Sequence, residues 1–212
     1  RLQPDGARGH HPGLGSRRGG GDGLTSADER PQRLVVVHVG RFDHGDIAVA
    51  GAVARRNPFT ALRAMLPAYA TALGTSSSAA TIPVTYECTR KNGVSASVAG
   101  FVIPLCATIH LSGSMLKITL FAFAVMFMDG MHIPLGVAVG FILMLGVTMV
   151  AAPGVPGGAI TAAVGLLSAS LGFNDDQVAL MIAAYIAIDS FGTACNVTGD
   201  GAIALVIDKR SE

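Results

Sequence analysis

A long stretch without basic residues constrains this chain more than any other feature. Residues 118–208 contain no lysine or arginine, and nine of the fifteen basic residues lie before Asn57. Half of the residues are hydrophobic and 14% are charged, whereas soluble domains contain about 25% charged residues. So few charges cannot easily cover the surface of a soluble domain. The region after Asn57 is therefore predicted to be embedded in a membrane.

Two pairs of apolar arms surround tips of small residues. The first pair, in residues 58–90, flanks the stretch GTSSSAATIP, and its arms of about 15 residues are too short to cross a hydrocarbon core of roughly 30 Å comfortably. The second pair, in residues 135–172, flanks PGVPGG. Irregular backbone at membrane depth is tolerated only inside protein or beside a cavity. Two re-entrant hairpins with tips near Ser77 and Pro156 are therefore predicted.

Two further apolar segments complete this region. Residues 98–128 are interrupted by HLSGS, which predicts a broken helix, and a last helix is expected from about Val178, with an apolar first part and a polar second part. The predicted fold is thus an all-α, multi-pass membrane protein. Short or interrupted apolar segments in corresponding positions point to the binding site of a secondary transporter.

Four polar residues share one face of the last predicted helix. Their spacing of i, i+4, i+7 and i+11 places them within a narrow wedge, and they are Asp189, Thr193, Asn196 and Asp200. Carboxylates are costly in a membrane, so they are expected to face a cavity. Their oxygens suit a hard cation. The alternative, a solvated cytoplasmic helix end, is disfavoured because residues 202–207 are apolar again.

Four motifs occur in a compatible order: SSSAATIP, IPLCATI, PGVPGG and NVTGD. Together they resemble the dicarboxylate/amino acid:cation symporter family, which includes glutamate transporters and sodium:dicarboxylate symporters. The resemblance implies that residues 57–212 are a partial transport domain. Residues 1–56 look atypical: residues 1–33 cannot build a core and are predicted to be disordered, and the whole segment is interpreted as disordered or mistranslated.

The family resemblance also implies an activity and a location. It implies sodium-coupled symport of an amino acid or dicarboxylate by a homotrimer in the plasma or inner membrane, with no enzymatic activity. The expected partners are the small-molecule substrate and the lipid bilayer, and the net charge of +1 gives no indication of a nucleic-acid partner.

The resemblance assigns roles to individual residues. The implied substrate-binding residues are Ser76, Ser77, Ser78, Ser114, Val155, Pro156, Gly157, Asp189, Thr193 and Asn196. Asn196 and Asp200 would bind sodium, with the backbone carbonyl near Cys106. A second sodium would use the carbonyl of Thr108 and carbonyls around Met149 and Ala152.

Three departures from the family pattern qualify these roles. The arginine expected three residues after Asp189 is Gly192, and the acid expected four residues before it is Tyr185. The usual NMDGT reads HLSGS, so His110 and Ser112 replace an asparagine and an aspartate. These departures predict a neutral amino acid substrate and fewer coupled sodium ions. His110 titrates near physiological pH when unperturbed, so a proton is an alternative coupling ion. In the other interpretation, His110 is a neutral hydrogen-bond donor that holds the broken helix.

Two rival functions are weighed against transport. One is an inactive truncated membrane fragment of such a symporter. The other is a soluble enzyme with a serine nucleophile, which is disfavoured because TSSSA lacks the GxSxG pattern. Lys117 is expected to snorkel to the interface or to be paired with an acid.

Overall fold

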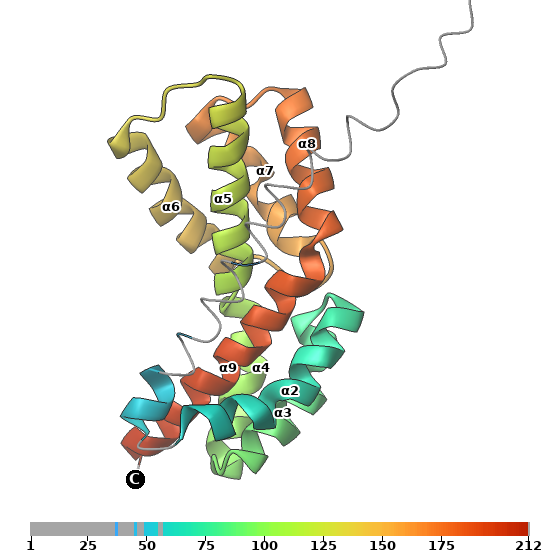
Figure 1. Cartoon of the computed structure of the whole chain (residues 1–212), viewed down its shortest axis with the longest axis vertical. Coiled ribbons are helices and arrows are strands. Elements are labelled where there is room, and N and C mark those ends of the chain that lie inside the picture. The colour runs from blue at the N-terminus through green and yellow to red at the C-terminus, as the bar shows by residue number, and fades with distance from the viewer. Residues whose placement is uncertain (1–36, 38–44, 46–48, 55–56, 212) are drawn as a thin grey trace, which may run out of the picture.

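The computed structural model describes residues 37, 45, 49–54 and 57–211. Every regular element in these ranges is an α-helix, as the sequence predicts (Figure 1). The helices are α2 (Pro58–Thr75), α3 (Ser78–Lys91), α4 (Ala96–Ile109), α5 (Ser112–Met128), α6 (Leu135–Val150), α7 (Gly158–Leu171), α8 (Asp175–Ala187) and α9 (Asp189–Ser211). The interpretation of residues 1–33 as disordered lies outside the described residues.

Helix pairs with short tips occupy both segments for which hairpins are predicted. α2 begins where the side chain of Asn57 accepts the Phe59 N–H at 2.9 Å, and it ends at Ser76, whose backbone is left-handed with φ 48°. Ser77 then starts α3 by accepting the Ala80 N–H at 3.1 Å. The second tip spans residues 151–157, between α6 and α7. Side-chain caps thus turn the serine-rich stretch into a tight reversal between two helices.

The predicted broken helix is present. α4 and α5 are separated only by His110 and Leu111. Together they form the stretch Ala96–Met128, which is long and apolar enough to cross a membrane. In the part of the chain that is described, this is the one stretch that meets the criterion alone, and α8 with α9 meets it as a bent pair.

The terminal segment differs from the single helix that the sequence predicts. The structure has two helices, α8 and α9, which are bent by 63° at Ile188. α8 starts earlier than Val178, at Asp175, behind a capping box formed by Asn174 and Gln177. No proline or glycine marks the bend, so periodicity alone runs straight through it. The bend places Asp189 in the first turn of α9, where the helix dipole favours a carboxylate.

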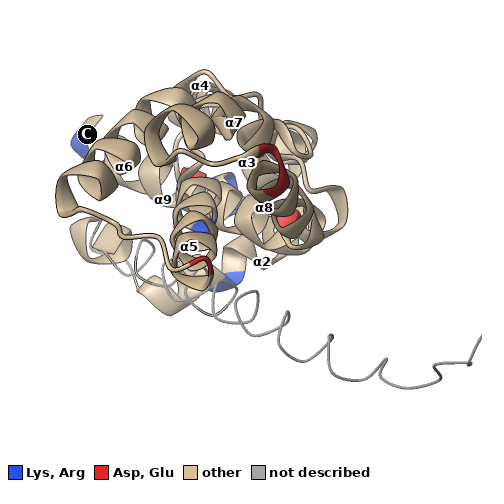
Figure 2. Cartoon of the chain, turned by 90° about the horizontal axis from the view of Figure 1, so that it is seen from above, with Lys and Arg blue, Asp and Glu red and all other residues tan. Residues whose placement is uncertain are grey.

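The core consists of two clusters that meet near the middle of the long axis. One cluster joins α5, α6, α7 and α8, and the other joins α2, α3, α4 and α9 from Ala194 onward. α9 connects them, running from the centre of the molecule toward one end (Figure 1). Seen along the long axis, charged residues occupy only small parts of the helices (Figure 2). The break between α4 and α5 and the bend between α8 and α9 therefore both lie where the two clusters meet.

Candidate functional site

The polar face of α9 is buried in the centre of the molecule. The four predicted side chains are between 1% and 6% exposed. Their helix also carries glycine, alanine and cysteine between them, so neighbouring helices approach closely. One example is Gly113 at the start of α5, where an added Cβ would lie 2.6 Å from the Gly192 carbonyl oxygen.

The two tips contact each other over this face. The Ser77 hydroxyl donates to the Gly154 carbonyl at 2.9 Å, and the Ala79 N–H donates to the same oxygen at 3.1 Å. The Gly157 N–H donates to Asp189 Oδ2 at 2.8 Å. A side chain at Gly154 would overlap the Ala107 carbonyl at the end of α4. The second tip is therefore held by the first tip, by α4 and by α9.

A small cavity lies beneath the tips. Its volume is about 10 Å³, which is about the space that one water molecule needs. It is lined by Ser76, Ser78, Leu111, Ser114, Pro153, Gly154, Val155, Ala159, Tyr185, Asp189, Thr193 and Asn196. Seven of the ten residues that the resemblance implies for the substrate thus surround one cavity. The other three, Ser77, Pro156 and Gly157, lie in the tips themselves.

Hydrogen bonds fix the polar groups around the cavity. The Ser114 hydroxyl accepts from the Tyr185 hydroxyl at 3.0 Å and from Asn196 Nδ2 at 3.2 Å. Asn196 Oδ1 in turn accepts the Gly113 N–H at 2.9 Å. The Thr193 hydroxyl donates to the carbonyl of Asp189, one turn earlier in α9. In this closed arrangement the polar groups satisfy one another, and a ligand would have to replace some of these bonds.

Lys117 is a charged residue that the motifs do not identify, and it lies behind two lining residues of the cavity, Asp189 and Tyr185. Its side chain is completely buried, and its Nζ lies 3.0 Å from Asp189 Oδ1 and 3.5 Å from the centre of the Tyr185 ring. It therefore pairs with an acid and does not snorkel. Two signals could have placed it here. Lys117 lies three residues after Ser114, so both share a helix face, and it is the only lysine or arginine between positions 92 and 208.

Asp200 lies on the other side of the helix break, beside His110. His110 Nδ1 is 2.8 Å from Asp200 Oδ1. Gly199 makes room for the ring, since an added Cβ there would lie 2.5 Å from His110 Cε1. Asp200 Oδ2 and the Ser112 hydroxyl are buried and have no hydrogen-bond partner among the residues described. An orphaned carboxylate oxygen of this kind fits a bound cation.

Three of the residues whose backbone carbonyls are expected to bind sodium are Cys106, Thr108 and Met149. The Cys106 carbonyl accepts the His110 N–H at 2.8 Å where α4 ends. Thr108 is exposed, and its hydroxyl donates to the Leu105 carbonyl. The Met149 carbonyl accepts the Ala152 N–H in the second tip. Two of these three carbonyls therefore already accept a backbone hydrogen bond, although each retains a second lone pair.

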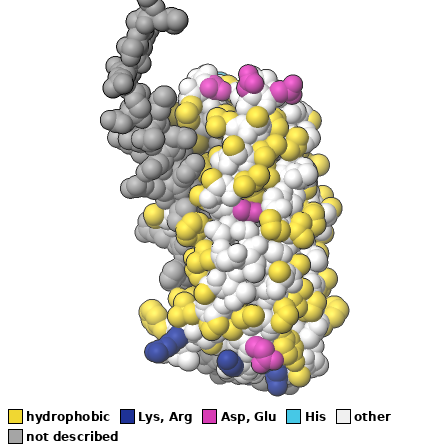
Figure 3. Space-filling view, turned by 90° about the vertical axis from the view of Figure 1, so that its right-hand side faces the viewer, with side chains coloured by type: hydrophobic (Ala, Val, Ile, Leu, Met, Phe, Trp, Pro, Cys, Tyr) yellow, Lys and Arg dark blue, Asp and Glu magenta, His cyan; other side chains and the backbone are white. Residues whose placement is uncertain are grey.

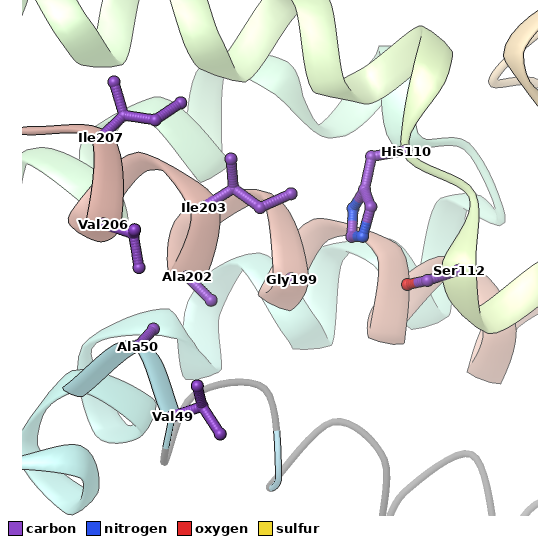
Figure 4. Close-up of a pocket in the computed structure, with 9 residues that line it drawn as sticks. All are labelled: Val49, Ala50, His110, Ser112, Gly199, Ala202, Ile203, Val206 and Ile207. Carbon is purple, nitrogen blue, oxygen red and sulfur yellow. The ribbon is translucent and has the colours of Figure 1, made fainter. Parts of the chain in front are cut away.

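A larger pocket adjoins the His110–Asp200 pair. Its volume is about 390 Å³, and His110 and Ser112 lie at one end of it, while the rest of its lining is apolar (Figure 4). The apolar side chains come from Val49, Ala50, Ala202, Ile203, Val206 and Ile207. His110 and Ser112, at the break between α4 and α5, therefore border an open pocket.

Comparison with known proteins places these features in a family. The model of the sodium:dicarboxylate symporter family matches residues 44–210. Human excitatory amino acid transporter 2 is 33% identical over 171 residues, which is 79% of this chain. Human excitatory amino acid transporter 1 is 33% identical over 160 residues, or 75% of this chain, and an excitatory amino acid transporter of Caenorhabditis elegans is 33% identical over 147 residues, or 69%.

The similarity covers a limited part of these relatives. The matched region is 30% of the length of human transporter 2 and 29% of the other two. The family match begins at residue 44 and includes both tips, the helix break and all of the polar face of α9.

Proposed function

The chain belongs to the sodium:dicarboxylate symporter family, and from this premise we propose that the protein is a secondary active transporter. It would couple the movement of a small carboxylate-bearing solute, an amino acid or a dicarboxylate, to the inward movement of sodium. The observation that carries this proposal is the closure of two helix tips over a buried carboxylate, Asp189. Buried acids on an otherwise apolar helix mark solute and ion pathways in membranes.

The positions of the residues support the roles that the family resemblance implies. The first tip offers backbone N–H groups and serine hydroxyls at a helix N-terminus, which suits the carboxylate of a substrate. Asp189 suits an ammonium group. Thr193 and Asn196 line the same cavity and would hydrogen-bond the bound solute.

Opening of the second tip would precede binding. The cavity holds about one water molecule, so the described conformation is closed and too small for an amino acid. The second tip rests on the first through the two bonds to the Gly154 carbonyl. Exchanging these bonds for bonds to a substrate would link binding to movement of the tip.

Sodium is proposed to bind at Asp200, with Asn196 and nearby carbonyls as further oxygen ligands. The orphaned Asp200 Oδ2 supports this role, and His110 occupies the other oxygen. The neutral Ser112 hydroxyl stands where the family pattern has an acid, which supports fewer coupled sodium ions. His110 is proposed to act as a hydrogen-bond donor that holds Asp200, and proton coupling through His110 is the alternative.

Location and assembly are also part of the proposal. The apolar stretch Ala96–Met128 supports insertion in a lipid bilayer, and we place the protein in the plasma or inner membrane as the homotrimer that the family resemblance implies. Figure 3 supports a bilayer orientation, because charged side chains gather at the two ends of the molecule and are scarce on the broad middle of that face.

Ligand-dependent stabilisation of the purified full-length protein tests the proposal. We expect thermal stability to rise with sodium, and further with aspartate, succinate or alanine only when sodium is present, because ligands that bind the native state raise its unfolding free energy. Choline replaces sodium in the control. Equal melting temperatures in all conditions would contradict the proposal. The alternative prediction, an inactive fragment, expects this second result.

A further inference from the structure

The cation at Asp189 carries an inference about substrate choice that rests on the proposed function. We propose that Lys117 is the specificity-determining cation of the substrate site. It pairs with Asp189 while the site is closed, and it receives the second carboxylate of an acidic amino acid when the ammonium group of that substrate takes its place at Asp189.

The surroundings of Lys117 place its charge beside the cavity, directly behind two of the residues that line it. Its Nζ is 3.0 Å from Asp189 Oδ1, 3.4 Å from the Ile188 carbonyl and 3.5 Å from the centre of the Tyr185 ring. Two of these partners, Asp189 and Tyr185, line the cavity themselves. The ammonium group is thus attached to α5 but held against the junction of α8 and α9, beside the position proposed for the substrate.

Lys117 also occupies the space above Gly192. An added Cβ at Gly192 would lie 2.9 Å from Lys117 Nζ and 3.0 Å from Cε. A larger side chain at position 192 would therefore displace the ammonium group. The expectation of a neutral substrate assumes that Gly192 leaves the site without a cation, and Lys117 supplies one from another helix.

Tyr185 stabilises the cation in the same place. Its ring faces the ammonium group, and an aromatic face attracts a cation, more strongly where both are desolvated. Its hydroxyl is directed to Ser114, which fixes the ring. The two departures from the family pattern around Asp189, Gly192 and Tyr185, are thus both in contact with Lys117.

The need of Lys117 for an anionic partner then determines which class of substrate the site prefers. In the closed site, Lys117 and Asp189 neutralise each other. A neutral amino acid would pair its ammonium with Asp189 and its carboxylate with the first tip, which would leave Lys117 buried without an anion. Such an uncompensated charge is strongly destabilising. An acidic amino acid brings a second carboxylate, which pairs with Lys117, so that each cation of the site has an anion beside it.

Competition binding by the full-length protein tests this role. Aspartate and alanine compete for sodium-dependent binding, with Lys117→Met, Lys117→Arg and Lys117→Met/Gly192→Arg beside the wild type. We expect the wild type to prefer aspartate. Lys117→Met should lower the aspartate-to-alanine affinity ratio about 100-fold or more, in line with the loss of one member of a buried ion pair, whereas Lys117→Arg should retain most of it.

The double variant moves the cation from α5 to α9. Lys117→Met removes Nζ, the atom nearest to a side chain at position 192, so Lys117→Met/Gly192→Arg should recover the preference for aspartate. A purely structural role of Lys117 would lower both affinities together and leave their ratio unchanged. Lys91→Met, which changes an exposed lysine at the end of α3, is the matched control and should leave the ratio unchanged.

The outcomes separate this inference from the proposed function. Wild-type preference for alanine, or an unchanged ratio in folded Lys117→Met, would overturn the role of Lys117 while sodium-dependent binding persists. If Lys117→Met does not fold, Lys117→Gln takes its place, and an unchanged ratio in folded Lys117→Gln would overturn the role. Absence of sodium-dependent binding of either amino acid to folded wild type would overturn the proposed function and this inference with it.

Discussion

Asp189 has both carboxylate oxygens in use before any substrate is present. Lys117 holds Oδ1, and the N–H of Gly157 in the second tip holds Oδ2. One residue thus links a cation on α5, a movable tip and the first turn of α9. A substrate ammonium that competes for this carboxylate would act on all three at once.

Replacing Asp189 by asparagine should remove amino acid binding. The variant loses the carboxylate proposed to hold the ammonium group, and it leaves Lys117 unpaired, which should cost about 3–5 kcal/mol of stability. Asp189→Asn/Lys117→Met should recover stability without recovering binding. Calorimetric binding and thermal unfolding measure the two effects separately, with the exposed Asp176→Asn as the control. Near-normal binding in Asp189→Asn would disprove the assignment.

Asp200 should determine sodium affinity. Asp200→Asn removes the orphaned carboxylate oxygen, and we expect the sodium concentration for half-maximal substrate binding to rise at least about tenfold, which corresponds to about 1.4 kcal/mol. Substrate affinity at saturating sodium should change much less. A sodium titration of substrate binding gives both values. An unchanged sodium concentration for half-maximal binding in Asp200→Asn would contradict sodium binding at Asp200.

His110 separates sodium coupling from proton coupling. His110→Asn removes the ring that contacts Asp200 and keeps a side chain that can donate a hydrogen bond. If the ring is a neutral donor, the pH profile of sodium-dependent uptake should be the same in both proteins. Loss of a pH dependence that the wild type has would instead support a proton as a coupling ion.

At the scale of elements, the second tip is the part proposed to move. Gly154 lies against the Ala107 carbonyl with no room for a side chain. Gly154→Ala should therefore lift the tip, since inserting a methyl group into a packed site costs about 1–3 kcal/mol. A change of that size alters a two-state equilibrium about 5- to 150-fold.

Thiol reactivity measures this opening. Ser78→Cys places a thiol under the closed tip, where residue 78 is 2% exposed. We expect this thiol to be modified at least about fivefold faster in the Gly154→Ala background. Gly140→Ala in α6, where an added Cβ meets nothing within 4 Å, is the control. Equal rates in both backgrounds would show that contact at Gly154 does not hold the tip closed.

Hairpins and the broken helix could be predicted from the sequence because arm length and tip composition are local features. The N-caps at Asn57 and Ser77 follow the same local rules. The bend at Ile188 could not be predicted this way. Its carbonyl accepts from Lys117 Nζ, 71 positions away in the chain, and a contact at that separation leaves no trace in helical periodicity.

The candidate site was likewise predictable from local sequence only in part. Spacing alone places Asp189, Thr193, Asn196 and Asp200 on one face, because they share a helix. The pairing of Asp189 with Lys117 depends on the packing of α5 against α9 and could not be read from either segment alone. The prediction of a neutral substrate rests mainly on Gly192 in place of an arginine, and the residue type at position 192 carries no information about a cation that another helix brings to Asp189.

At the scale of the whole molecule, the exposed charges among the described residues gather at two ends. Asp129, Asp175 and Asp176 lie where α5 ends and α8 begins, and the Asp129–Gln177 hydrogen bond joins these segments. Lys91, Lys209 and Arg210 lie where α3 and α9 end, and Asp208 accepts the Ser95 N–H there. Figure 3 shows acidic side chains at one end and both basic and acidic side chains at the other. Basic segments favour the cytoplasmic side of a membrane.

This separation predicts the orientation of the protein in the membrane. A cysteine introduced as Asp175→Cys should react with a membrane-impermeant thiol reagent added to intact cells. Lys91→Cys should react only after the cells are permeabilised. The native cysteines Cys88, Cys106 and Cys195 are buried and provide a low background. The opposite labelling pattern would invert the proposed orientation.

The most direct test of the central claim is sodium-driven uptake by the full-length protein in liposomes. An inward sodium gradient should drive accumulation of labelled aspartate above its equilibrium level, and replacing sodium with choline on both sides should abolish it. The Asp189→Asn protein, reconstituted to the same density, should show no accumulation. Accumulation that is equal in choline, or equal in the Asp189→Asn protein, would contradict sodium-coupled transport through this site.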